Sequence, residues 1–253
     1  MARPELEESN PPQEGRWFTT THWSVVLTAK QGDFPDAAAA LEELCRTYWP
    51  PLYAYIRREG YDATEAQDLT QEFFGRLLEK DFLRHLHDRR GKFRSFLLTF
   101  LKHFLSEKRR SARTQKRGGG KALFSLDATH GEAGFLLEPA DELTPNQVFE
   151  RRWAQTILQT ALNRLRDEFA ARRQLGLFDR LQDYQPHEPG GKTYAELGEE
   201  FGMTEAAVKS AVQRMRKRHR ELLREEISHT VTRPEEIDDE LRHFRALLGG
   251  ERG

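Results

Sequence analysis

Six side chains that can donate hydrogen bonds recur at helical spacing after Thr204. They are Lys209, Ser210, Gln213, Arg214, Arg216 and Lys217. Arginine and glutamine can pair with the edges of guanine and adenine, and lysine and arginine can neutralise phosphates. This set therefore favours nucleic-acid binding. The alternative interpretation is the solvated basic face of an ordinary amphipathic helix.

Two helices joined by a tight turn must position these side chains. Thr193 and Glu196 have the spacing of a capping box, which predicts a first helix. Gly202 can end that helix in a left-handed turn, and Thr204 can cap a second helix whose first turn contains Glu205. The pattern predicts a helix-turn-helix, which presents its second helix to the major groove. Its inward positions are small or apolar: Ala195, Leu197, Phe201, Met203, Val208, Val212 and Met215.

A second set of polar side chains lies in an earlier basic stretch. Its candidates are Arg89, Arg90, Lys92, Arg94, Ser95, Thr99, Lys102, His103, Arg109 and Arg110. Most belong to a predicted helix with one apolar stripe, formed by Phe93, Phe96, Leu97, Phe100, Leu101, Phe104 and Leu105. We expect the stripe to form core rather than to stack on bases. Arg94, Ser95, Thr99, Lys102 and His103 are expected on the outward face.

Charge is segregated along the chain, although the formal net charge is only −1. Residues 84–121 contain 13 Lys/Arg and 2 Asp/Glu, and residues 205–224 contain 7 and 2. Residues 122–150 contain 6 acidic and no basic residues, and residues 225–253 contain 8 and 4. Two basic blocks that alternate with acidic segments are typical of a protein that binds a polyanion.

The pattern predicts an all-α fold with two helical domains, a flexible linker and a C-terminal helix. The expected divisions are 1–16 disordered, 17–115 a first domain, 116–143 an acidic, glycine-containing linker, 144–228 a second domain and 229–253 a C-terminal extension. Expected helices cover about 17–30, 36–59, 62–80, 93 onward, 144–169, 170–184 and 234 onward, besides the helix-turn-helix. Pro50-Pro51 should kink or briefly break the second of these.

Composition and hydropathy limit the remaining classes of protein to which the chain can belong. The longest nearly apolar run, Phe96–Leu101, is too short to cross a bilayer, and no secretory signal is visible at the start. Cys45 is the single cysteine, which excludes an internal disulfide framework and suits the cytosol. We therefore expect a cytoplasmic protein without membrane insertion.

Three motifs resemble those of an RNA polymerase sigma factor of the small extracytoplasmic-function (ECF) type. The first is Asp68-Leu-Thr-Gln-Glu-Phe-Phe74, and the second is Phe93-Arg-Ser-Phe-Leu97. The third is Thr193-Tyr-Ala-Glu-Leu197 followed by Val208-Lys-Ser210. They occur in the family's order, and the resemblance covers about residues 35–115 and 145–226.

The resemblance implies core RNA polymerase and promoter DNA as partners, with duplex DNA at the minus-thirty-five element and melted DNA at the minus-ten element. Asp68, Gln71 and Glu72 would face the polymerase clamp, unless they form only a solvated helix face. The basic set around residues 89–110 would hold the minus-ten strand. Thr204, Lys209, Ser210, Gln213 and Arg214 would lie near minus-thirty-five bases, with Arg216, Lys217 and Arg220 at phosphates. An anti-sigma protein remains open as a further partner.

The sequence also departs from the family pattern. The linker is long and acidic, residues 170–191 are expanded, and the helix after Pro234 is an additional element. One hypothesis is that the acidic tail docks on a basic DNA-binding face and restrains it.

Catalytic interpretations have little support in the sequence. Residues 186–193 nearly match a phosphate-binding loop but lack its first glycine and the preceding strand. His85 and His87 have no further metal ligands at familiar spacing, and Cys45 lies near an apolar face. We expect no enzyme activity, cofactor or metal. The alternatives to a sigma factor are a stand-alone helix-turn-helix regulator and, less favoured, a nucleic-acid-processing enzyme.

Overall fold

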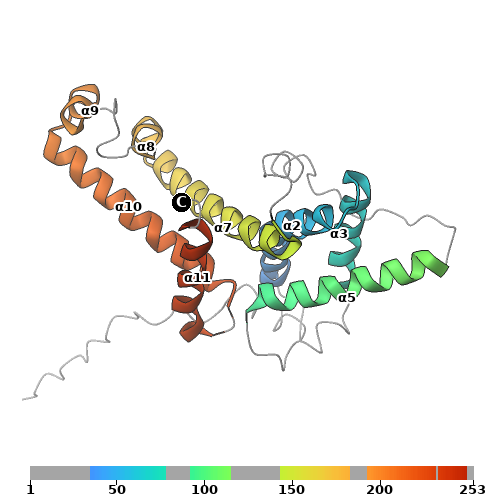
Figure 1. Cartoon of the computed structure of the whole chain (residues 1–253). Coiled ribbons are helices and arrows are strands. Elements are labelled where there is room, and N and C mark those ends of the chain that lie inside the picture. The colour runs from blue at the N-terminus through green and yellow to red at the C-terminus, as the bar shows by residue number, and fades with distance from the viewer. Residues whose placement is uncertain (1–34, 78–91, 115–142, 183–192, 232, 250–253) are drawn as a thin grey trace, which may run out of the picture.

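The computed structural model describes residues 35–77, 92–114, 143–182, 193–231 and 233–249, and every regular element in them is helical (Figure 1). The helices are α2 (Pro35–Arg58), α3 (Ala63–Leu77), α5 (Phe93–Thr114), α7 (Pro145–Ala171), α8 (Leu175–Gln182), α9 (Tyr194–Phe201), α10 (Glu205–Ser228), the short 3₁₀ helix η2 (Pro234–Glu236) and α11 (Ile237–Gly249). The predicted all-α class is confirmed.

Local sequence signals set most helix starts. The Thr144 hydroxyl accepts from the backbone N–H of Gln147, whose side chain returns a bond to the Thr144 backbone. Thr193 and Glu196 form the same reciprocal cap at the start of α9. Each box satisfies N–H groups that have no partner within the helix. The capping predictions at both sites are confirmed.

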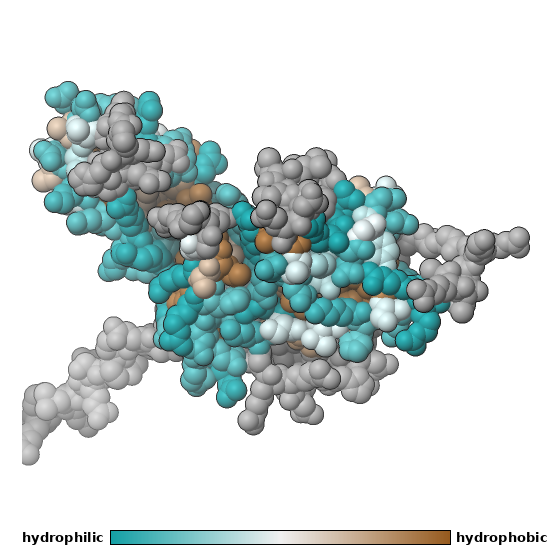
Figure 2. Space-filling model, viewed as in Figure 1, coloured by the Kyte–Doolittle hydropathy of each residue, from teal (hydrophilic) through white to brown (hydrophobic). Residues whose placement is uncertain are grey.

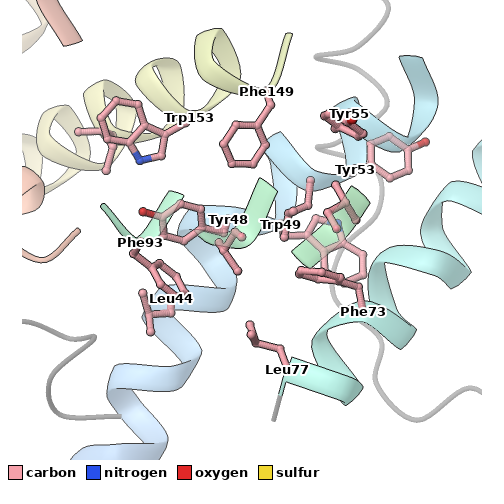
Figure 3. Packing of buried hydrophobic residues seen from close by; sticks show 14 of the residues in the cluster. Leu44, Tyr48, Trp49, Tyr53, Tyr55, Phe73, Leu77, Phe93, Phe149 and Trp153 are labelled. Carbon is pink, nitrogen blue, oxygen red and sulfur yellow. The ribbon is translucent and has the colours of Figure 1, made fainter. Parts of the chain in front are cut away.

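The first core lies where α2, α3 and α5 meet α7 and α11. Tyr48 of α2 packs edge-on against Phe93 of α5, with ring centroids 5.0 Å apart. Figure 3 shows Phe149 and Trp153 of α7 on the same side of this cluster, pointing toward α2. Apolar residues from the end of α10, the segment after it and α11 complete the core: Ile227, Val231, Ile237, Leu241 and Phe244.

The second core joins the C-terminal half of α7 to α8, α9 and α10. Its buried members are Ala161, Leu165, Phe178, Leu181, Leu197, Val208, Ala211, Val212, Met215 and Leu222. Helices α7 and α10 lie side by side, and apolar residues show between them in Figure 2. Because α7 and α10 contribute to both cores, the expected boundary at residue 144 does not separate the cores.

Three helix predictions differ from the structure or lie outside it. Of the kink or brief break expected at Pro50-Pro51, the break does not occur, because α2 is continuous through both prolines, with Tyr48, Trp49 and Leu52 buried around that point. Helix α8 begins only at Leu175, because the chain turns at Arg173, where φ is +57°. The helix expected over 17–30 lies outside the described residues.

The C-terminal segment agrees with its predicted pattern. Pro234 opens η2, and α11 buries Ile237, Leu241 and Phe244, whereas Leu248 is half-buried. The ring of Phe244 meets that of Trp153 edge-on at 6.2 Å. The C-terminal extension is therefore packed into the first core rather than attached beside it.

Candidate nucleic-acid and polymerase interface

Helix α10 presents the predicted recognition residues on its outer face. Lys209, Gln213, Arg214, Arg216 and Lys217 are exposed, and Ser210 is half-exposed. Val208, Ala211, Val212 and Met215 are buried on the opposite face. In Figure 2 the visible face of the α9–α10 arm is mainly hydrophilic. The helical spacing therefore gathers hydrogen-bond donors on one side and packing residues on the other.

The turn before α10 is tightly built. Gly202 adopts φ +62°, a conformation that glycine tolerates better than other residues. Thr204 caps α10 by accepting from the backbone N–H of Ala207 at 3.2 Å. The Met203 N–H donates to the Gly198 carbonyl at 2.8 Å, and a Cβ on Gly198 would lie 2.6 Å from the Met203 carbonyl oxygen. Sequence reasoning missed Gly198, although a glycine inside a short helix signals such a close approach.

Ion pairs between α7 and α10 hold the two helices together. The Arg218 guanidinium donates to both carboxylate oxygens of Glu168, one of them at 2.8 Å. This pairing lowers the pKa of Glu168 below its ordinary value. Arg164 of α7 bridges Glu225 at 2.7 Å and also Glu226 of α10. Both groups of ion pairs hold α7 and α10 against each other along the length over which they pack.

The outer face of α5 carries part of the second predicted set. Ser95, Thr99, Lys102 and His103 are exposed. Arg109 is exposed but bonded to Glu59 of α2, and Arg110 is exposed as well. Arg89 and Arg90 lie outside the described residues. The structure thus brings four of the ten predicted minus-ten residues together on one helix face, with Arg109 and Arg110 at its C-terminal end.

Arg94 does not lie on that outward face, and this part of the sequence prediction is wrong. Its side chain is buried, bonded to Glu240 of α11 and Glu150 of α7, and its guanidinium lies 5.2 Å from the centre of the Trp153 ring. Lys92, half-buried, pairs with the same Glu240 at 2.6 Å. The reason is tertiary: α11 covers the start of α5, which helical spacing within α5 cannot reveal.

These four residues form what we call the Arg94 cluster: Lys92, Arg94, Glu150 and Glu240. The Glu240 side chain is 0% exposed. Burial opposes its charge, but the hydrogen bonds and charges of Arg94 and Lys92 are stronger and lower the pKa of Glu240. His243 adds a contact to Glu150 at 3.0 Å. The cluster joins α5, α7 and α11 through ion pairs that are largely shielded from water.

Helix α3 presents the predicted polymerase-facing residues. Asp68 and Glu72 are exposed and Gln71 is half-exposed, opposite the buried Ala66, Thr70, Phe73, Phe74 and Leu77. Glu72 is bonded to Arg76 at 3.4 Å and to Lys108 of α5. The three side chains share one accessible face, but Glu72 is already held by two cations.

Chemistry other than binding finds little support in the described residues. Burial raises the pKa of the Cys45 thiol to about 11, with a smaller contribution from Glu42. A pKa in this range leaves little thiolate, the nucleophilic form of cysteine, at neutral pH. Within the described ranges no group of three or more His, Cys, Asp or Glu side chains could hold a metal ion. His85, His87 and residues 186–192 lie outside those ranges.

This all-helical protein has two basic helix faces, and one of them lies within a helix-turn-helix. These features place it in the class of DNA-binding proteins. The model of the ECF sigma factor family matches residues 28–225, more than three quarters of the chain. The chain therefore belongs to the ECF sigma factor family and directs promoter-specific transcription together with core RNA polymerase. No curated protein and no solved structure matches it. Among the described helices, none has the length and apolarity needed to cross a membrane.

Proposed function

We propose that the exposed face of α10 reads the minus-thirty-five element in the major groove. The observation that carries this assignment is the separation of α10 into a buried apolar face and an exposed face with Lys209, Gln213 and Arg214. These three residues and Ser210 would lie at base edges, with Thr204 at the helix start. Arg216, Lys217 and Arg220 would contact phosphates, which position the helix without reading sequence.

The exposed face of α5 is assigned to the minus-ten strand. Lys102 and His103 project from it beside Ser95 and Thr99, and Arg109 and Arg110 extend the positive charge. Cations that follow one helix suit the phosphates of a single strand. Lys92 and Arg94 can join this set only when they separate from Glu240.

Asp68, Gln71 and Glu72 on α3 are assigned to the polymerase clamp. Their shared exposed face, outside the first core, supports this assignment. The protein would act in the bacterial cytoplasm, where core polymerase and promoter DNA meet. An anti-sigma protein would be a further partner.

Run-off transcription with core polymerase on a genomic library tests the proposal and also yields the promoter consensus. The paired variant Lys209→Ala/Arg214→Ala should lose promoter-specific transcripts but still bind core polymerase. Asp68→Ala/Gln71→Ala should weaken polymerase binding instead. If the first variant transcribed the same promoters as the wild type, the assignment of α10 would be wrong.

A further inference from the structure

We infer that Arg109, near the C-terminal end of α5, reads a guanine within or beside the minus-ten element, and that Glu59 and Tyr61 position its guanidinium. This inference rests on the proposed assignment of the exposed face of α5 to promoter DNA. Arg109 would then differ in role from Lys102, a cation of the same helix that suits a phosphate.

Arg109 lies on the side of α5 that is assigned to DNA. It follows Lys102 by seven residues, or about two helical turns, so both side chains project from the same side of the helix. Both residues are exposed, and 48% of the Arg109 side chain is accessible. The guanidinium can therefore meet DNA that lies along Lys102.

Two groups from the turn between α2 and α3 hold the Arg109 guanidinium. The Glu59 carboxylate accepts a hydrogen bond from Nη2 of Arg109. The ring of Tyr61 lies 5.8 Å from the guanidinium carbon. A long, exposed side chain has many rotamers, and contacts with two neighbours restrict it to few of them. The arginine is therefore held in one orientation before any DNA binds.

The turn that carries these two groups is itself held by hydrogen bonds. The backbone N–H of Glu59 donates to the Tyr55 carbonyl at 3.0 Å, which extends the bonding pattern of α2 past its last residue. The Tyr61 carbonyl accepts from the Arg57 side chain at 2.9 Å. The Asp62 side chain caps the start of α3 by accepting from a backbone N–H at 2.8 Å. Glu59 and Tyr61 therefore extend from a fixed piece of backbone.

The ion pair with Glu59 favours a base over a phosphate as the ligand of Arg109. A phosphate close to Arg109 would also lie close to the negative charge of Glu59, which offsets the attraction. The bond to Glu59 engages one of the five N–H donors of the guanidinium. A guanidinium in a fixed plane can donate two parallel hydrogen bonds, and guanine presents two acceptors, O6 and N7, on one edge.

Promoter binding by the polymerase holoenzyme tests the assignment, with a promoter recovered by run-off transcription. Each guanine around the minus-ten element is changed in turn to the other bases and to 7-deazaguanine, which lacks the N7 acceptor. At one position the wild type should bind about tenfold more weakly after a base change, and 7-deazaguanine there should also weaken binding. Arg109→Ala should abolish the preference at that position alone. A promoter at which no guanine is preferred would overturn the inference.

Glu59→Gln tests the positioning role, because it removes the charge and keeps the shape. The preference for the same guanine should fall to about threefold. Binding to the other three bases should become tighter, since a negative charge beside the DNA is gone. Glu107→Gln is the matched control: it removes an exposed carboxylate from the same end of α5 and should keep the tenfold preference. Tyr61→Leu, which keeps the ion pair and removes the ring, should also lower the preference.

Salt dependence separates a base contact from a phosphate contact. Lys102→Gln should lower the slope of log K against log salt concentration by about 1, because a phosphate contact is lost. The double variant Glu59→Gln/Arg109→Gln removes two charges that cancel, so its slope should equal that of the wild type. A slope lowered by about 1 in the double variant would assign Arg109 to phosphate and overturn the inference.

Two further results would overturn the inference. One is an Arg109→Ala protein with a lower melting temperature and every base preference intact, since the ion pair would then only join α5 to the turn. The other is a folded Glu59→Gln protein that keeps the full preference for guanine. Failure of the proposed assignment of α5 is distinguishable, because Lys102→Gln would then keep the wild-type promoter affinity and salt dependence.

Discussion

At the residue scale, the close approach between α9 and the turn makes Gly198 a structural requirement of the helix-turn-helix. Gly198→Ala should lower the free energy of unfolding by about 1–3 kcal/mol, because the added Cβ meets the backbone oxygen of Met203 at 2.6 Å. Gly75→Ala on α3 is the control, since nothing lies within 4 Å of its added Cβ. Alanine there should stabilise the helix by about 0.5–1 kcal/mol. Urea unfolding of both variants would measure the opposite signs, and equal effects would contradict the argument.

Also at the residue scale, the proposed assignment of α10 to the major groove places the exposed Arg214 at a base edge. Arg214→Ala should weaken binding to a recovered minus-thirty-five duplex by about 1–3 kcal/mol and relax the preference at one base pair. Fluorescence anisotropy on the promoter and on single-base variants would measure both effects. Arg242→Ala removes another exposed arginine, from α11, and should leave affinity unchanged. A uniform loss over all sequences would instead assign Arg214 to phosphate.

At the element scale, the ion pair between Arg218 and Glu168 makes the pairing of α7 with α10 sensitive to acid. The folded pKa of Glu168 is lowered, first by the hydrogen bond from Arg218. Its contribution to stability is therefore present above the unfolded pKa, about 4.3, and is lost as pH falls through the lower folded pKa. Glu168→Gln should lower the free energy of unfolding at pH 7. Below pH 5, the variant should lose less stability than the wild type as the pH falls.

Urea midpoints across that pH range would measure this dependence. Glu199→Gln, which removes an exposed carboxylate from the neighbouring α9, should keep the wild-type profile. A Glu168→Gln profile as steep as that of the wild type would show that the acid sensitivity has another origin.

Sequence patterns predict the helices better than their pairing. Thr144 and Thr193 signal helix starts because a cap needs only residues three positions apart. The same local logic fails at Arg94, whose partner Glu240 is 146 residues away in sequence. Helical spacing within α5 predicts that Arg94 and Ser95 both lie on the outward face. The docking of α11 buries Arg94 and leaves Ser95 exposed. Long-range packing therefore limits what could be predicted of the site.

At the scale of the whole molecule, α7 and α10 link the two cores mechanically. Phe149 and Trp153 pack in the first core, whereas Ala161 and Leu165 of the same helix pack in the second. Because α7 is one continuous helix, loss of packing around one half should destabilise the packing around the other half. The free protein should therefore behave as one cooperative unit, although its sequence is arranged as two parts and a linker.

Trp153→Leu tests this coupling. The variant leaves a cavity in the first core and should destabilise the protein by about 2–4 kcal/mol. If the cores are coupled, exchange of the α9 and α10 amides in the second core should accelerate as much as that of the α3 amides. Hydrogen exchange followed by mass spectrometry would show this at peptide resolution. Phe178→Leu, a comparable change in the second core, should produce the reciprocal pattern. Acceleration confined to the mutated core in each variant would mean that the cores unfold independently and that α7 is a hinge rather than a rigid link.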